Sequence, residues 1–456
     1  MRLWDPHSRI YYDVPDQRRG TLQLSPPLVL ALGTVLLAFL GTLALKMPWA
    51  AHQPLEWVQA AFMATSAVTI TGLAVIDPGS QLTVAGQMTL ILLVQLGGLG
   101  FVTFAVLAAM SLGARIGIGQ QMLAQEAYNQ THLAQAATTA RAVLLYSLFF
   151  EAVGFVLLTL LWRDELGVRQ AMYHGLFFSV SAFNNAGFSL HATSLMPFGG
   201  DAAVQTVISL LFLAGGLGFV VLLDIRHQRR WSRLSTNTRV VLTATAVLSL
   251  GAFVLIWLLE ARNPKTLAPL AWPQQAVLAW FQAVTPRSAG FNSLDIASMT
   301  DASTVLMTAL MFIGGGSMGT SGGIKLGTFV ILVVATYAYL RRRDEVTLFG
   351  RSVPQRLVMK ALSLALITLF LIFCGVFVLA ALEPGLPLVD VMFEVVSALC
   401  TVGLSRGLTG QLSTVGQSVL IVLMIIGRLG PLTLGYILAT PQTRRVRHPE
   451  CEIQVG

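Results

Sequence analysis

The chain has 456 residues, of which 55% are hydrophobic and only 11% are charged, and its mean hydropathy is +0.72. A soluble domain carries about 25% charged residues, so this composition excludes an ordinary globular enzyme, a disordered scaffold and a nucleic-acid-binding protein. The net charge of +8 comes from basic residues between apolar runs, which favours contact with a lipid surface. Three scattered cysteines imply no disulfide framework, and the seven histidines lack metal-ligand spacing. These features predict a polytopic membrane protein.

Long apolar runs predict eight membrane spans. A spanning helix needs about 20 mostly apolar residues, and the first run, Pro27 to Leu45, contains no charge. We interpret this run as a span and not as a cleaved signal peptide, because it exceeds the roughly 7–15 apolar residues of such a peptide. The further runs cover 84–110, 142–162, 202–223, 240–259, 302–340, 358–382 and 416–439.

The distribution of Lys and Arg predicts the orientation. With eight spans, twenty of these residues fall on the side of both termini, and seven fall on the opposite side. Cytoplasmic loops carry the excess of positive charge. Both termini are therefore predicted to be cytoplasmic, in a multi-pass protein of the plasma (inner) membrane.

Four shorter apolar segments, each after an odd-numbered span, predict re-entrant helices, because about 10–14 apolar residues are too few to cross. They cover 55–68, 171–183, 275–286 and 388–399. Each precedes a glycine that stands ten residues after an aromatic residue; the pairs are Phe62 and Gly72, Phe177 and Gly187, Trp280 and Gly290, and Phe393 and Gly403. Six residues before the glycine stand Ser66, Ser181 and Ser397, while Val284 breaks this pattern in the third copy.

A second motif, Gly-x-Leu/Met-Gly, follows each of these glycines. Its four copies begin at Gly97, Gly215, Gly316 and Gly427, which are 25, 28, 26 and 24 residues after the first motif. Taken alone, this motif favours close helix packing through small residues. Two motifs in step through four copies predict tandem repeats.

The predicted fold is therefore an all-α polytopic membrane protein, with four tandem helix–re-entrant pore helix–helix repeats around a pseudo-fourfold central pore. The predicted segments are a cytoplasmic N-terminus 1–26, repeat 1 27–110, a cytoplasmic loop 111–141, repeat 2 142–223, a cytoplasmic loop 224–239, repeat 3 240–340 with an intramembrane loop 314–323, a cytoplasmic loop 341–357, repeat 4 358–440 and a cytoplasmic tail 441–456.

The repeated glycines indicate a cation pathway. Irregular backbone persists at membrane depth only where it is buried or lines a water-filled cavity. There its carbonyl groups can replace the hydration shell of a cation, and glycine allows the positive φ that aims them at one axis. The negative C-terminal ends of four short helices would also favour a cation. A helix C-cap explains one such glycine, but not four in register. The predicted selectivity filter consists of Thr69, Ile70, Thr71, Gly72, Asn185, Ala186, Gly187, Ser288, Ala289, Gly290, Thr401, Val402 and Gly403.

The glycine-rich run in the third repeat predicts a gate. Each glycine costs about 1 kcal/mol in a helix relative to alanine, so the span must break there. We expect a flexible loop beneath the filter that obstructs the path; a static packing break is the alternative. A phosphate-binding loop is disfavoured, because the Gly-Lys-Ser/Thr ending of that motif is missing. The predicted gate residues are Gly314, Gly315, Gly316, Ser317, Met318, Gly319, Thr320, Ser321, Gly322, Gly323, Lys325 and Arg428.

Arg428 joins this group because it interrupts the last apolar run. A charge at this depth costs about 2.5–3.5 kcal/mol on insertion scales and usually marks a pathway. The alternative is that Arg428 pairs with a buried carboxylate such as Glu151. Cys400, three residues before Gly403, offers a thiol probe: an externally applied thiol reagent should slow uptake if this side chain is reachable from the filter entrance.

Three segments resemble a known family. Thr69 to Leu73, Thr285 to Phe291 and Gly314 to Lys325 resemble the Ktr/Trk/HKT superfamily of potassium transporters. Eight spans and a length near 450 residues are more similar to the Ktr-type membrane subunit than to the bacterial Trk type. The resemblance implies potassium uptake, often sodium-dependent, by a homodimer above a cytosolic ring of nucleotide-binding regulatory subunits. In the plant branch, glycine at the first filter position goes with potassium and serine with sodium, so Gly72 favours potassium.

The expected function is potassium uptake driven by the membrane potential, since the chain shows no ATP-binding motif. Potassium, bound at carbonyls near the four filter glycines, is the expected cargo; sodium stays open as a second ion, and no organic cofactor, catalytic residue or nucleic-acid partner is expected. The alternatives are a sodium-permeable or non-selective cation transporter of the same fold, an organic-solute secondary transporter or an intramembrane enzyme. An organic-solute carrier would more often show two large halves with paired broken helices, and an enzyme would need converging catalytic side chains.

Overall fold

The computed structural model describes residues 26–100, 135–317, 319–343 and 345–430. Within these ranges the regular secondary structure is almost entirely helical, which confirms the predicted all-α fold class. The exception is a small antiparallel hairpin of β1 (Thr347–Leu348) and β2 (Arg351–Ser352). The expected N-terminal segment, most of the 111–141 loop and the tail lie outside the described residues.

The helices form four units with the same order of elements. In each unit a long helix leads into a pore helix, and a further helix follows the predicted filter glycine. Unit 1 contains α1 (Pro26–Lys46), α2 (Trp57–Val68), the short α3 (Pro78–Gln81) and α4 (Val84–Leu99). Unit 2 contains α7 (Gln135–Leu166), α8 (Val168–Phe183), η1 (Met196–Phe198), α9 (Ala202–Leu217) and α10 (Phe219–Gln228).

Units 3 and 4 follow after η2 (Trp231–Arg233). Unit 3 contains α11 (Thr236–Glu260), α12 (Trp272–Val284), η3 (Ile296–Ser298), α13 (Asp301–Phe312) and α14 (Leu326–Leu340). Unit 4 contains α15 (Gln355–Leu382), α16 (Leu388–Leu399), η4 (Thr409–Gln411) and α17 (Thr414–Leu429).

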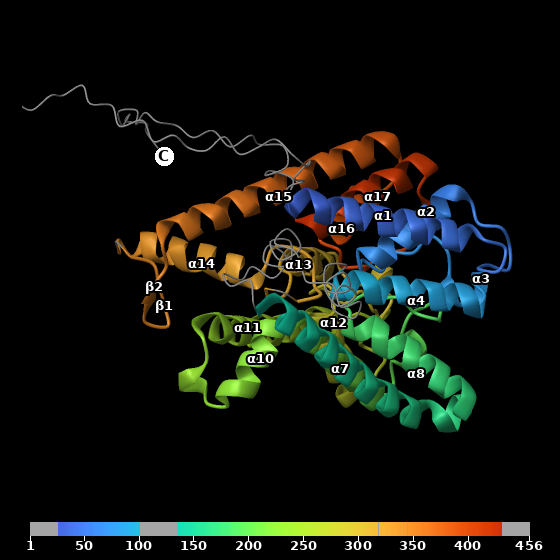
Figure 1. The fold of residues 1–456 in the computed structure, drawn as a ribbon, viewed down its shortest axis with the longest axis horizontal. Helices are drawn as coiled ribbons and strands as arrows, with labels where there is room; N and C mark the ends of the chain where they lie inside the picture. Colours follow the sequence, from blue (N-terminus) through green and yellow to red (C-terminus); the bar gives the residue numbers. More distant parts are fainter. Residues whose placement is uncertain (1–25, 101–134, 318, 344, 431–456) are drawn as a thin grey trace, which may run out of the picture.

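The four units close a ring in chain order. Helix α4 packs against the pore helix α8 of the next unit, α9 packs against α12, α13 packs against α16, and α17 packs back against α2. In Figure 1 the blue helices of unit 1 lie beside the green helices of unit 2, and the orange and red helices of unit 4 return to unit 1. This cyclic packing gives the pseudo-fourfold arrangement.

The pore helices α2, α8, α12 and α16 have 12, 16, 13 and 12 residues. At 1.5 Å per residue they extend about 18–24 Å, which is less than the roughly 30 Å of a hydrocarbon core. Their C-terminal halves are mostly buried, and an aromatic side chain with no exposed area anchors each of them: Phe62, Phe177, Phe281 and Phe393. In α12 the anchor is Phe281, because its neighbour Trp280 is only partly buried.

Within the described ranges, three helices are long and apolar enough to cross a membrane alone, namely α7, α11 and α15. The expected span over 202–223 consists of α9 and α10, which meet at an angle of 93°. The expected run over 302–340 consists of α13 and α14 on either side of a loop. The runs over 84–110 and 416–439 extend beyond the described residues, so the eight-span topology stays a prediction.

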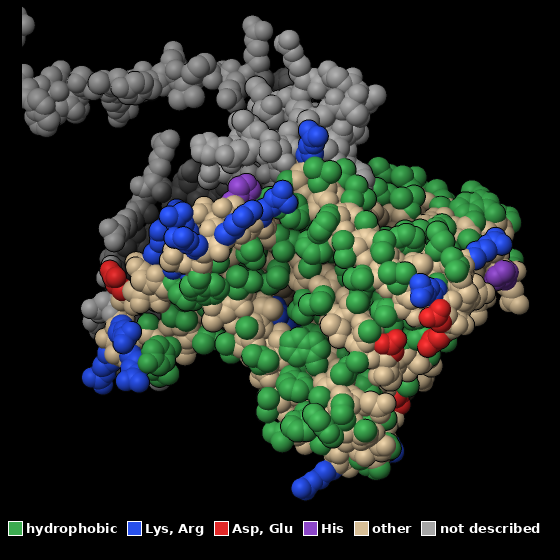
Figure 2. Space-filling view, turned by 90° about the horizontal axis from the view of Figure 1, so that it is seen from below, with side chains coloured by type: hydrophobic (Ala, Val, Ile, Leu, Met, Phe, Trp, Pro, Cys, Tyr) green, Lys and Arg blue, Asp and Glu red, His purple; other side chains and the backbone are tan. Residues whose placement is uncertain are grey.

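Hydrophobic side chains cover the middle of the face in Figure 2, and charged side chains gather toward its edges. Phe370, Phe373 and Phe377 on α15 are 65%, 68% and 67% exposed. Exposed apolar surface of this extent is expected where lipid and not water surrounds the protein.

Candidate functional site

The four predicted filter glycines meet at the centre of the ring. A Cβ atom added to any one of them would strike the neighbouring filter loop. The closest approaches are 2.1 Å from Gly72 to Ala186 O, 2.8 Å from Gly187 to Gly290 Cα, 2.6 Å from Gly290 to Val402 O, and 2.1 Å from Gly403 to Thr71 O. Each glycine therefore contacts the following loop, and the fourth contacts the first.

The backbone of the four loops repeats as closely as their positions do. As predicted, all four glycines have positive φ: +89° at Gly72, +69° at Gly187, +77° at Gly290 and +92° at Gly403. The residue two before each glycine is also left-handed, at +51° for Ile70, +57° for Asn185, +71° for Ser288 and +47° for Thr401. Such strain costs about 1–3 kcal/mol per residue and is typical of functional sites. Sequence reasoning missed it; at two of the four positions, Ile70 and Thr401, the residue is β-branched and rarely adopts positive φ.

All thirteen predicted filter residues lie in these loops. The residues of the set that precede each glycine, three in unit 1 and two in each other unit, are buried, and Gly72 and Gly403 are partly buried. Thr69 and Thr71 contact each other through their hydroxyl groups at 2.8 Å. The structure thus brings the complete predicted set together around one centre.

Hydroxyl groups behind the loops hold their shape. Ser66 and Ser397 each accept a hydrogen bond from the N–H of their own filter glycine at 3.1 Å. In units 2 and 3, Ser181 and Thr285 donate to the carbonyl oxygen of the phenylalanine after the glycine, at 2.9 and 2.5 Å. The break in the serine pattern at Val284 is therefore compensated one residue later.

Glu151 lies behind the filter loop of unit 2. Its Oε1 accepts from Ser147 Oγ at 2.5 Å and from Asn184 Nδ2 at 3.2 Å, and its Oε2 accepts from Gln95 Nε2 at 3.1 Å. Asn184 immediately precedes the left-handed Asn185. The alternative that Arg428 pairs with Glu151 is therefore wrong, and the carboxylate instead supports a filter loop through Asn184.

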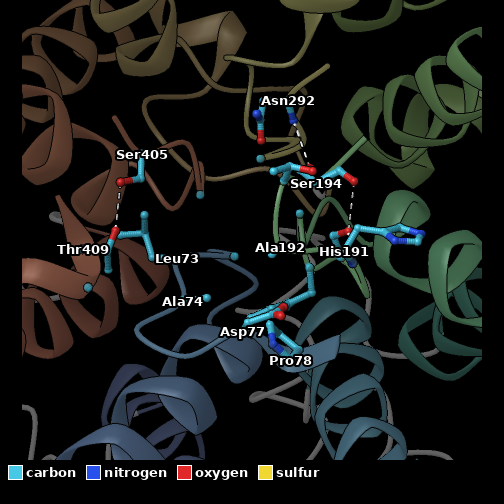
Figure 3. A pocket seen from close by; sticks show the side chains of 18 of the residues that line it. Leu73, Ala74, Asp77, Pro78, His191, Ala192, Ser194, Asn292, Ser405 and Thr409 are labelled. Atoms are coloured by element: carbon cyan, nitrogen blue, oxygen red, sulfur yellow. Dashed lines mark hydrogen bonds between the residues drawn. The ribbon is translucent and has the colours of Figure 1, made fainter. Parts of the chain in front are cut away.

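An outer cavity of about 440 Å³ opens above the filter and is lined by all four glycines and by residues of the loops that follow them. Its charged lining residues are Asp77 and Asp295, which favour a cation. Figure 3 shows residues of all four units around this space. His191 also borders it; burial lowers the pKa of this imidazole below its ordinary value, and the nearby Asp77 opposes the shift.

The glycine-rich loop of unit 3 lies on the opposite side of the filter from the outer cavity. Its base is closed by backbone bonds from Gly314 N to Ile324 O at 2.9 Å and from Leu326 N to Gly315 O at 2.9 Å. Gly316 N donates to Gly216 O at 2.8 Å, so the loop pairs with a free carbonyl at the end of α9. The described gate residues 314–317 and 319–323 form this loop, and Met318 lies outside the described residues.

Two basic side chains hold the loop in place through hydrogen bonds. Arg428 donates to Thr320 O at 3.1 Å and also to Gly97 O of unit 1. Lys325 Nζ donates to Ser321 O at 2.7 Å. The ion pairs in the described part of the chain, Arg163–Asp164 and Arg406–Asp390, involve neither cation.

The Gly-x-Leu/Met-Gly motif serves both packing and helix termination. A Cβ on Gly97, Gly215 or Gly427 would lie 2.0, 1.9 or 1.9 Å from the last carbonyl oxygen of the pore helix in the same unit. This confirms the close-packing interpretation in three units. The last glycine of these three motifs has positive φ and ends the helix: Gly100, Gly218 and Gly430.

Cys400 is buried and cannot serve as a probe of the filter entrance. Its side chain has no exposed area and packs in the apolar core behind the fourth filter loop. A reagent in the outer cavity would meet Gly403 and not this thiol.

Four short helices that aim at one ring of backbone, with an outer cavity on one side and a tethered loop on the other, define a membrane protein with a central passage for small cations. Residues 28–447 match the family model TrkH, described as cation transport protein. The chain belongs to this family.

Relatives cover nearly the whole chain. The "Ktr system potassium uptake protein B" of Bacillus subtilis (strain 168) is 42% identical over 95% of this chain and 98% of its own length. The "potassium/sodium uptake protein NtpJ" of Enterococcus hirae is 33% identical over 96% of this chain and 99% of its own length. The crystal structure of the potassium transporter TrkH from Vibrio parahaemolyticus has the same fold, with a TM-score of 0.73, 22% identity, and coverage of 93% of this chain and 86% of that chain.

Proposed function

We propose that the chain takes up potassium ions through the central passage, with the thirteen predicted filter residues as its selectivity filter. The observation that carries this proposal is the ring of four glycines at the bottom of the outer cavity. There, main-chain carbonyls replace water around a dehydrated cation. A membrane potential of 100 mV is worth roughly 2.3 kcal/mol per charge, which suffices for uptake without ATP.

Potassium is proposed over sodium because all four filter positions carry glycine and because a relative at 42% identity is named for potassium uptake. The second candidate is a transporter that also admits sodium. The relative named for potassium/sodium uptake favours it.

The loop 314–323, with Lys325 and Arg428, is proposed as the gate. It lies on the inner side of the filter and is bonded to unit 2 at Gly216 O and to Arg428 of unit 4, which also donates to Gly97 O of unit 1. Release of these bonds would allow the loop to move aside.

The proposed assembly is a homodimer with both termini in the cytoplasm and a cytosolic nucleotide-binding regulatory ring beneath it. The excess of Lys and Arg in the segments on one side of the chain supports this orientation. The basic segments 224–239 and 341–357 are the proposed contact region for the regulatory subunit.

Rubidium uptake by the purified chain in liposomes tests the proposal, with potassium and sodium as competitors. Wild-type protein is expected to take up rubidium, and potassium is expected to compete better than sodium. Gly72→Ser would place a side chain at φ +89° beside Ala186 O, so sodium should compete better in this variant. An unchanged competition ratio with intact uptake would argue against the filter assignment.

A further inference from the structure

The intramembrane loop contacts three filter loops at the same position of each, two residues before the glycine. Thr320 Oγ1 donates to Asn185 Oδ1 at 3.0 Å, and Gly322 N donates to Ser288 Oγ at 2.9 Å. A Cβ on Gly322 would lie only 1.9 Å from Thr401 Oγ1. These three filter residues are polar, left-handed and buried. The equivalent residue of unit 1 is apolar.

Ser288 makes the most direct of these connections. A serine hydroxyl has one proton to donate and two lone pairs. Ser288 Oγ donates its proton to Thr401 O at 2.7 Å and accepts the N–H of Gly322. One hydroxyl group therefore joins filter loop 3, filter loop 4 and the intramembrane loop.

We propose that Ser288 couples the intramembrane loop to the filter, so that movement of the loop changes the filter as well as the inner path. This inference rests on the proposed roles of the filter and the loop. Left-handed residues at Ser288 and Thr401 persist only while their surroundings hold them. In the position observed, Gly322 fills one side of both residues. The Thr401 hydroxyl has no hydrogen-bond partner among the described residues. Filter loop 4 has its own bonds from Val402 N to Ser397 O and from Gly403 N to Ser397 Oγ, and the bond from Ser288 Oγ to Thr401 O and the packed loop add support from outside it. When the loop withdraws, filter loops 3 and 4 lose a shared support.

The test compares Ser288→Ala with Ser288→Thr in liposomes, each in the complete chain and in a chain lacking 317–322. The readouts are rubidium flux and the potassium-to-sodium competition ratio. Loss of a hydrogen bond worth about 1 kcal/mol corresponds to a change of about fivefold in an equilibrium between loop positions. Ser288→Ala should therefore raise rubidium flux about fivefold and lower the potassium-to-sodium competition ratio. Ser288→Thr keeps the hydroxyl and should stay near wild type, because Thr401 occupies the equivalent place in unit 4.

The loop deletion separates coupling from a local effect. If Ser288 acts through the loop, Ser288→Ala should change flux less than about twofold once the loop is gone, because the two changes share one interaction. The same factor in both backgrounds, or no effect in either, would overturn the coupling.

Two further variants act as controls. Ser293→Ala removes a buried hydroxyl that has no hydrogen-bond partner among the described residues, five residues further along unit 3, and should leave both readouts unchanged.

Thr320→Val removes the hydrogen bond between the loop and Asn185 without changing a filter residue. It therefore tests the same coupling if Ser288→Ala fails to fold. It should change flux in the same direction, and a Thr320→Val protein with unaltered flux and ratio would then contradict the coupling. Absence of rubidium uptake by the wild type would instead overturn the proposed function.

Discussion

Units 2 and 3 present the same filter backbone but place opposite charges beside it. Behind filter loop 2, the carboxylate of Glu151 accepts three hydrogen bonds and reaches the loop through Asn184. Filter loop 3 carries Arg287, which is 7% exposed and donates only long bonds of 3.4 Å to Ser249 Oγ and Thr245 Oγ1. The fourfold symmetry therefore belongs to the backbone, and the chemistry around it differs from unit to unit.

The inner ends of the two units differ as well. In unit 2 the Gly215–Gly218 motif packs on the pore helix and produces a single sharp bend into α10. In unit 3 the corresponding Gly316 packs on Leu217 O of unit 2 instead, and the chain forms a loop before α14. One unit thus supplies a fixed support, and the other supplies the segment that rests on it.

Loss of the Arg428 side chain, which holds the intramembrane loop of unit 3, should have the largest effect on ion flux. Arg428→Ala deletes two bonds from a charged donor, each worth about 1.5–3 kcal/mol, and removes a positive charge from the inner side of the passage. Rubidium flux in liposomes is expected to rise at least about tenfold. Arg428→Lys, which keeps the charge but not the forked donor, should give an intermediate rise. A fall in flux with intact protein would show that Arg428 is structural.

Glu151→Leu should destabilise unit 2. The change removes the acceptor of Ser147, Gln95 and Asn184, and loss of such buried partners costs about 1–3 kcal/mol. We expect a lower free energy of unfolding in detergent and a lower potassium-to-sodium ratio, since Asn184 adjoins the left-handed Asn185. Glu151→Gln retains one acceptor oxygen and should cost less. An equal free energy of unfolding for Glu151→Leu and the wild type would show that the carboxylate does not support the filter loop of unit 2.

The sequence predicted the fold and the centre of the site because both follow from spacing. Apolar runs too short to cross, each followed by a glycine at a fixed interval, are sufficient to place four pore helices around one axis. The φ of the glycines was predictable for the same reason, since only this residue fills such positions without a steric cost.

The supports of the loops were not predictable from spacing. Arg428 and Gly97 are 331 residues apart, and no local pattern pairs them. The left-handed Ile70 contradicts its own backbone preference, because the tertiary packing overrides it. The alternative pairing of Glu151 with Arg428 is wrong because buried charged groups in a membrane protein can hydrogen-bond to amide and carbonyl groups instead of to each other.

Arg287→Met should be tolerated in unit 3, in contrast to Glu151→Leu in unit 2. Replacing a buried charge by an apolar side chain of similar length is often neutral or stabilising, and the two hydroxyl groups that lose Arg287 make only long bonds with it. The free energy of unfolding is expected to change by less than about 1 kcal/mol. A loss as large as that of Glu151→Leu would show that the guanidinium group holds filter loop 3.

The smallest expected difference concerns pH, because the outer loop of unit 2 contains His191 and the loop 291–300 of unit 3 contains no histidine. Burial lowers the pKa of His191 in the folded protein, whereas an unfolded histidine titrates near about 6.5. Below that pH the unfolded chain therefore binds more protons at this position than the folded protein does, and stability falls as the pH falls. The difference in Tm between pH 7.5 and pH 5.5 should be smaller in His191→Gln than in the wild type, while a substitution in the unit 3 loop, Asn292→Gln, should leave this difference as it is. An equal difference in Tm between the two pH values in His191→Gln and the wild type would mean that this imidazole does not contribute to the loss of stability at low pH.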